Sequence, residues 1–167
     1  VFATGKKLGQ RMLEKYPESV PIRYGYVINL SRWGQVYGIV AAAREGVAGQ
    51  IRSHSKKMIE LNPGYRNAAP YRILGLVHHK APYIPFILSW PSTDKALEYL
   101  GEAVERAPDE PANRYHYASV LAEAGRTEDA LDQLNELRNL PVRSSSPVED
   151  RRTFEQAEAL RAKLENS

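Results

Sequence analysis

Four prolines, each directly after an amphipathic helical pattern, constrain this chain more than any other feature. They are Pro17, Pro63, Pro108 and Pro141, and they recur at 46-, 45- and 33-residue intervals. The last interval is close to the period of about 34 residues at which one class of two-helix repeats recurs. A helical hairpin cannot bury its apolar face alone, so it stacks on neighbouring hairpins. We therefore predict an all-α superhelix of helical hairpins.

The spacing predicts a single domain over residues 1–167, with units at about 18–63, 64–108 and 109–141. The stretch at 146–165 has the pattern of a further amphipathic helix. We expect it to cap the superhelix at its carboxyl end, because terminal repeats need a polar outer face.

The clearest hairpin runs from Pro111 to Pro141. Apolar residues recur at helical spacing on both sides of Gly125, at Tyr117, Ala118, Leu121 and Ala122 before it and at Ala130, Leu131, Leu134 and Leu137 after it. This spacing places each set on one face of a helix. Two antiparallel helices joined by a tight turn follow from it.

At these positions the chain resembles the tetratricopeptide repeat family. The small, large, turn, small and large positions of that family are occupied by Ala118, Leu121, Gly125, Ala130 and Leu134. Arg114 stands where the family often has Trp, and Leu137 where it favours Ala, so we expect the hairpin to splay slightly. The resemblance implies a non-enzymatic module that binds a protein partner in the groove of the superhelix.

By this repeat pattern, a proline-rich insertion interrupts the middle unit. Gly75 and Ala96 are 21 residues apart where the pattern needs about 12, and Pro82, Pro85 and Pro91 prevent a regular helix between them. The insertion also carries the large apolar residues Tyr83, Phe86, Ile87, Leu88 and Trp90. Two roles are open for it: a cover that completes the core of its own hairpin, or a lid or docking patch over the groove.

A narrower resemblance covers roughly residues 16–141. The segment from Tyr71 to Pro82, the insertion and the Asp94-Lys-Ala-Leu pattern are similar to the T component of TRAP transporters. This resemblance implies a transporter-associated, periplasmic or membrane-tethered component; a cytoplasmic location stays open. The glycine-rich turn of that family is replaced here by residues 89–93, which weighs against transfer of its ligand pocket.

In the first unit, Trp33 and Tyr37 are four residues apart and share a helix face, which Val36, Ile39 and Val40 extend. We expect this apolar surface to be buried against a neighbouring hairpin.

Charge is distributed unevenly along the chain. Residues 1–92 hold 13 Lys and Arg against 4 Asp and Glu, whereas residues 93–167 hold 10 against 16. The basic half would attract an acidic partner or the acidic end of a second copy, since such asymmetry steers association. The alternative is an ordinary solvated surface that keeps the protein in solution.

No pattern in the sequence indicates catalysis, a cofactor or a metal. It has no Cys, no glycine-rich phosphate loop, no nucleophile elbow and no His-Glu-x-x-His spacing. His78 and His79 are adjacent and would point about 100° apart on a helix, so we expect structural or surface roles for both. The basic segment at 52–57 lacks interleaved aromatic residues, which disfavours nucleic-acid binding. No apolar run reaches the length of a membrane span.

The resemblance to tetratricopeptide repeats implies which residues face the groove. These are Arg72, Leu76, His79, Tyr115 and Ser119, with Tyr83, Phe86 and Trp90 of the insertion nearby. The leading hypothesis is recognition of an extended or helical protein segment. The alternative is capture of a small apolar or carboxylate ligand beneath the 80–92 insertion, with Arg72 as counter-ion.

Overall fold

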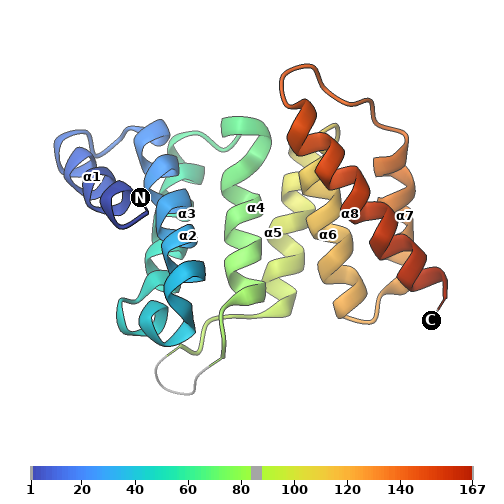
Figure 1. The fold of residues 1–167 in the computed structure, drawn as a ribbon, viewed down its shortest axis with the longest axis horizontal. Helices are drawn as coiled ribbons and strands as arrows, with labels where there is room; N and C mark the ends of the chain where they lie inside the picture. Colours follow the sequence, from blue (N-terminus) through green and yellow to red (C-terminus); the bar gives the residue numbers. More distant parts are fainter. Residues whose placement is uncertain (1, 84–87, 167) are drawn as a thin grey trace.

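A computed structural model describes residues 2–83 and 88–166, apart from the side chain of Ile39. These residues form eight helices that follow one another across the molecule (Figure 1). In chain order they are α1 (Phe2–Lys15), α2 (Val20–Arg44), α3 (Val47–Leu61), α4 (Tyr65–Lys80), α5 (Thr93–Arg106), α6 (Pro111–Glu123), α7 (Thr127–Arg138) and α8 (Pro147–Glu165).

The expected all-α repeat fold is confirmed. Helices α2 and α3, α4 and α5, and α6 and α7 pack as consecutive pairs, and each pair stacks on the next. Helix α8 lies across α6 and α7 at one end, while α1 packs on α2 at the other (Figure 1). The insertion joins α4 to α5, and α8 is the expected terminal helix.

The apolar residues that the helical spacing singles out form the core. One large cluster lies among α2, α3 and α4 around Leu30, Met58 and Leu74, all fully buried. A second lies among α6, α7 and α8 around Leu121 and Leu134. Small side chains let the helices approach closely between these larger ones, at Ala96, Ala103, Ala118 and Ala130, which have no exposed surface.

Gly75 allows a further close approach, between α4 and α5. A Cβ atom at this position would lie 2.7 Å from Leu100 Cγ and 3.0 Å from the carbonyl oxygen of Ala96. We therefore expect Gly75→Ala to lower the free energy of unfolding by about 1–3 kcal/mol through overpacking. Urea titration followed by circular dichroism measures this change.

Gly101→Ala is the matched control in the adjoining helix, since its Cβ would stand 3.6 Å from the Tyr117 hydroxyl, an ordinary contact. It should stabilise the protein by about 0.5–1 kcal/mol, because alanine has the higher helix propensity. Equal effects of the two substitutions would contradict the close approach at Gly75.

The apolar surface expected to be buried around Trp33 is exposed over most of its area. Val36, Tyr37 and Val40 are exposed and Trp33 is buried, while the side chain of Ile39 lies outside the described part of the structure. The reason is a break at Gly38, whose φ of 84° is non-helical. A Cβ on Gly34 would lie 3.5 Å from Ala42 Cβ, whereas residues eight apart in a straight helix are separated by about 12 Å. The chain thus folds back after Gly38 and brings Ala42 against the helix at Gly34. Val36, Tyr37 and Val40, which a continuous helix was expected to bury, are left exposed.

Helix α4 also departs from a simple helix at its start. Arg66, Asn67 and Ala68 have φ values of 45°, 57° and 60°, a left-handed conformation that costs energy for residues other than glycine. The regular right-handed turns therefore begin after Ala68, which places Pro70 near their start, where its missing N–H is tolerated.

None of the helices in the described residues combines the length and apolar character that crossing a membrane requires.

Candidate binding surfaces

Five of the residues expected to face a groove lie on α4 and α6, and two of them, Arg72 and His79, make polar contacts from α4 to α6. Arg72 donates from one terminal nitrogen to Asn113 Oδ1 at 2.6 Å. His79 Nε2 lies 3.1 Å from a carboxylate oxygen of Glu123. Between them, Leu76 packs partly buried against a cluster that includes Leu100 and Val120. We call this surface, made of Arg72, Leu76, His79, Tyr115 and Ser119, the α4–α6 face.

The α6 side of this face is half-buried. Tyr115 and Ser119 both retain partial exposure, and the Tyr115 ring packs 5.1 Å from the His116 ring. Burial, and then the positive charges of Arg72 and Lys80, lower the pKa of His116 to about 4. His116 is therefore neutral at pH 7.

Trp90 is the large residue by which the described part of the insertion packs on the helices. The Trp90 ring lies edge-on against His78, with centroids 4.9 Å apart, and the Arg52 guanidinium lies 4.8 Å from its centroid. Tyr83 is 64% exposed, and Phe86 lies outside the described residues. The structure thus brings Trp90 together with residues of α3 and α4, whereas Arg72 pairs with α6.

A buried polar cluster, which sequence reasoning missed, fixes the junction between the second and third hairpins. Asn113 has no exposed surface. Its amide nitrogen donates to the carbonyl oxygens of Ala103 at 2.8 Å and Asn67 at 3.1 Å, while its amide oxygen accepts from Arg72. This one side chain of α6 therefore ties α6 to α5, to the left-handed start of α4 and to the middle of α4.

Arg143 extends this cluster toward α8. It donates to both carboxylate oxygens of Glu110 and of Asp150, two nearly fully buried acids. Hydrogen bonds from Arg143 lower the pKa of Asp150, and those from Arg143 and Asn67 lower the pKa of Glu110 against the opposing effect of burial. From the sequence alone, residues 143–147 have the pattern of a short linker. Nothing in the sequence near Arg143 indicates that its partners lie at the starts of α6 and α8, so the sequence does not predict this cluster.

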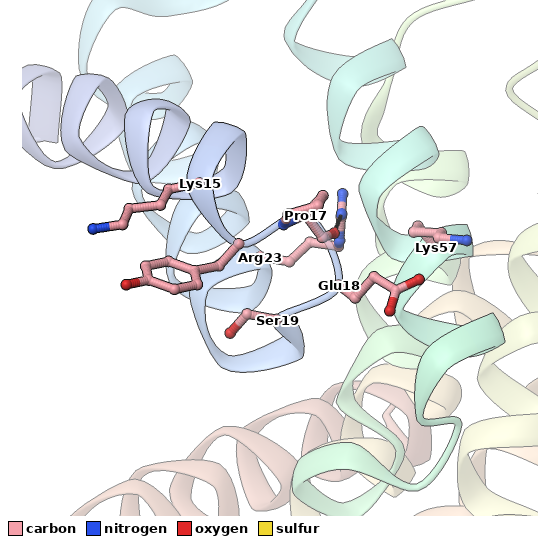
Figure 2. A pocket seen from close by; sticks show the side chains of 7 residues that line it. Lys15, Pro17, Glu18, Ser19, Arg23 and Lys57 are labelled. Carbon is pink, nitrogen blue, oxygen red and sulfur yellow. Dashed lines mark hydrogen bonds between the residues drawn. The ribbon is translucent and has the colours of Figure 1, made fainter.

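Two adjoining clefts lie among α1, α2 and α3. The larger, about 620 Å³, is lined by Lys15, Tyr16, Pro17, Glu18, Ser19, Arg23 and Lys57 (Figure 2). The smaller, about 380 Å³, is lined by Gln10, Leu13, Glu14, Arg23, Tyr26, Gln50 and His54. Arg23 belongs to both. The sequence analysis did not single it out, because its surroundings come from three different helices.

Arg23 is only 9% exposed and has unusual partners. One terminal nitrogen lies 2.6 Å from His54 Nδ1, and the other donates to the Pro17 carbonyl oxygen. Its Nε has no hydrogen-bond partner, and no acid in the described part of the chain forms an ion pair with it. Burial accordingly lowers the pKa of Arg23.

Comparison with known families finds one match. Residues 92–142, which span α5, α6 and α7, match the model of the tetratricopeptide repeat. A search of curated proteins found no match to the chain. The match supports the tetratricopeptide repeat assignment for this segment, and repeats of this kind stack into superhelices that commonly serve as protein-binding surfaces.

Proposed function

We propose that the chain is a non-enzymatic interaction module that binds a segment of a partner protein on the α4–α6 face. The observation that carries this proposal is the match of residues 92–142 to the tetratricopeptide repeat, in a fold of stacked helical hairpins. Helix α6 lies within the matched segment, and α4 precedes it as the first helix of the neighbouring hairpin.

The contacts of this face favour recognition with little ordering cost. Arg72 and His79 are held by partners on α6, so their positions are set before a ligand arrives. Leu76 and Tyr115 add apolar area beside them. A preorganised surface of mixed polarity loses less side-chain entropy when it binds a peptide.

The excess of positive charge in residues 1–92 favours an acidic partner, which it would attract at long range. The association with a transporter, implied by the narrower resemblance, remains a more specific version of the same proposal. Of the two roles for the insertion, the contact of Trp90 with His78 of α4 supports a cover for its own hairpin, and the contact with Arg52 of α3 extends that cover to the preceding hairpin. The alternative ligand site beneath it has less support, because Arg72 contacts Asn113 of α6 whereas Trp90 of the insertion contacts residues of α3 and α4.

Ser119→Arg tests the face directly. It adds a long charged side chain at a half-buried position of α6 and breaks no hydrogen bond seen in the structure. We expect it to weaken capture of the partner about tenfold or more by steric exclusion. Wild type and variant serve as baits in native extract, and the captured protein is then purified and titrated by calorimetry.

Asn135→Arg is the control, since it introduces the same side chain at an exposed position of α7. It should leave the affinity unchanged. Equal affinity for the wild type and both variants would place the interface elsewhere, and equal loss with both would indicate a general charge effect.

A further inference from the structure

We infer that the larger cleft, between the α1–α2 turn and α3, is an anion-binding site that takes a single carboxylate or phosphate group, with Arg23 as its buried cation. This site is separate from the α4–α6 face, so the two proposals stand or fall independently.

The first argument is the uncompensated charge of Arg23. A buried ion is costly unless an opposite charge or a full set of hydrogen bonds replaces its water. A guanidinium has five N–H donors, of which His54 and Pro17 take two, and its Nε is without a partner. Nε is buried, but each terminal nitrogen keeps one further N–H, and two such donors match the two oxygens of a carboxylate or phosphate.

The second argument is the start of α2, which borders the same cleft. Ser19 is the N-cap residue, yet its side chain accepts no capping hydrogen bond, and the first turn contains no acidic residue. The positive end of the helix dipole is therefore without a capping side chain or an acid in its first turn, and the nearest acid along the chain, Glu18, precedes the cap. Helix N-termini of this kind stabilise bound anions.

The remaining walls agree with an anion. Lys15 from α1 and Lys57 from α3 lie on either side of Arg23 and Pro17, with their ammonium groups pointing outward (Figure 2), so they contribute positive potential at the rim of the cleft. Lys57 also pairs with Glu60 at 3.0 Å. Glu18 is the one acid that lines this cleft, and it would repel an anion at the rim.

The test is titration of the isotope-labelled full chain with sodium glutarate, followed by NMR at constant ionic strength. We expect saturable shifts of the Arg23 Nε–H and of the Val20 and Ile22 amides, with a dissociation constant in the millimolar range or below. Arg23→Met should weaken binding about 10- to 100-fold, since hydrogen bonds to charged groups contribute that much. Glu18→Gln should tighten it, because the repelling charge is removed.

Stability distinguishes a ligand-binding arginine from a structural one. Without anion, Arg23→Met should keep or raise the melting temperature, because an apolar side chain of similar length removes an unpaired buried charge. Arg32 is an exposed arginine in the same helix, and Arg32→Met should change neither the anion affinity nor the melting temperature. The inference is overturned if glutarate and phosphate both give no saturable shift, if Arg23→Met binds like wild type, or if it unfolds at markedly lower temperature.

Three probes distinguish which kind of molecule supplies the anion: an oligoglutamate peptide, glutarate and inorganic phosphate. A capped oligoglutamate peptide that binds more tightly than glutarate assigns the cleft to an acidic polypeptide. Equal affinity assigns it to a free carboxylate, and tighter binding of inorganic phosphate assigns it to a phosphorylated small molecule. Each of these results supports the site itself.

Discussion

Asn113→Ala should lower the free energy of unfolding by about 4 kcal/mol, since it leaves several buried polar groups without a partner. The Arg72 guanidinium loses its acceptor, and the carbonyl oxygens of Asn67 and Ala103 lose their donor. The left-handed turn at Arg66–Ala68 also loses the hydrogen bond to Asn67 that holds it in place. Because proteins are stable by only about 5–15 kcal/mol, a large share of the total would be lost.

The loss should also change how the protein unfolds. Asn113 belongs to α6, and its side chain binds residues of α4 and α5, so it couples the stability of neighbouring hairpins. Each repeat depends on its interface with the next one. We therefore expect Asn113→Ala to separate unfolding in urea into two steps. Fluorescence of Trp33 and Trp90 reports the amino-terminal hairpins, and circular dichroism reports all the helices.

Asn135→Ala, at an exposed position, is the control and should change stability by less than about 0.5 kcal/mol. A single cooperative transition for Asn113→Ala, with a loss of under about 1 kcal/mol, would show that water satisfies the exposed donors and acceptors and that Asn113 does not couple the hairpins.

Local patterns account for the part of the fold that the sequence predicts well. The hairpin of α6 and α7 follows from small and large apolar residues at helical spacing around Gly125, and all of that information lies within about one repeat. The fold-back at Gly38 does not follow in the same way. Glycine permits a positive φ but does not require it. Whether the helix breaks at Gly38 depends on the packing of Ala42 beside Gly34, which no local pattern shows.

The buried polar contacts of Asn113 and Arg143 could not be predicted from the sequence either, because their partners are distant along the chain. Asn113 contacts Asn67 across 46 residues of sequence and Arg72 across 41, and Arg143 contacts Glu110 across 33. No periodic pattern connects such positions, because polar side chains on a helix are ordinarily solvated. Reasoning from the repeat alignment selected Arg72 for the groove. The structure adds that its guanidinium is already bound by a buried amide, so substitution of Arg72 would test stability together with binding.

Arg143→Met should destabilise the protein by about 3–5 kcal/mol at pH 7, because it leaves the buried carboxylates of Glu110 and Asp150 without their cation. Glu110 at the start of α6 and Asp150 at the start of α8 both bind Arg143, which lies in the segment before α8. The docking of α8 on α6 and α7 should weaken with them. Urea unfolding at pH 7 measures the loss.

The dependence on pH should change sign in this variant. In the wild type, Arg143 holds the pKa of Asp150 below its ordinary value of 3.8 and that of Glu110 below 4.5. Groups with a lowered pKa in the folded state stabilise it above their unfolded pKa, and this contribution is lost as the pH falls through the folded pKa. Wild-type stability should therefore decline below about pH 4.

Without Arg143, burial is the largest effect left on both carboxyl groups, opposed at Glu110 by Asn67 and Arg72, so we expect both pKa values to rise above those of the unfolded chain. The folded state then binds protons more readily, so Arg143→Met should gain stability as the pH falls from about 6 toward 4. Adding Glu110→Gln and Asp150→Asn should recover much of the loss at pH 7 and remove this pH dependence, because no unpaired buried charge remains. If Arg143→Met followed the wild-type curve with a constant offset, the carboxylates would be compensated by water, and Arg143 would act only through its packing.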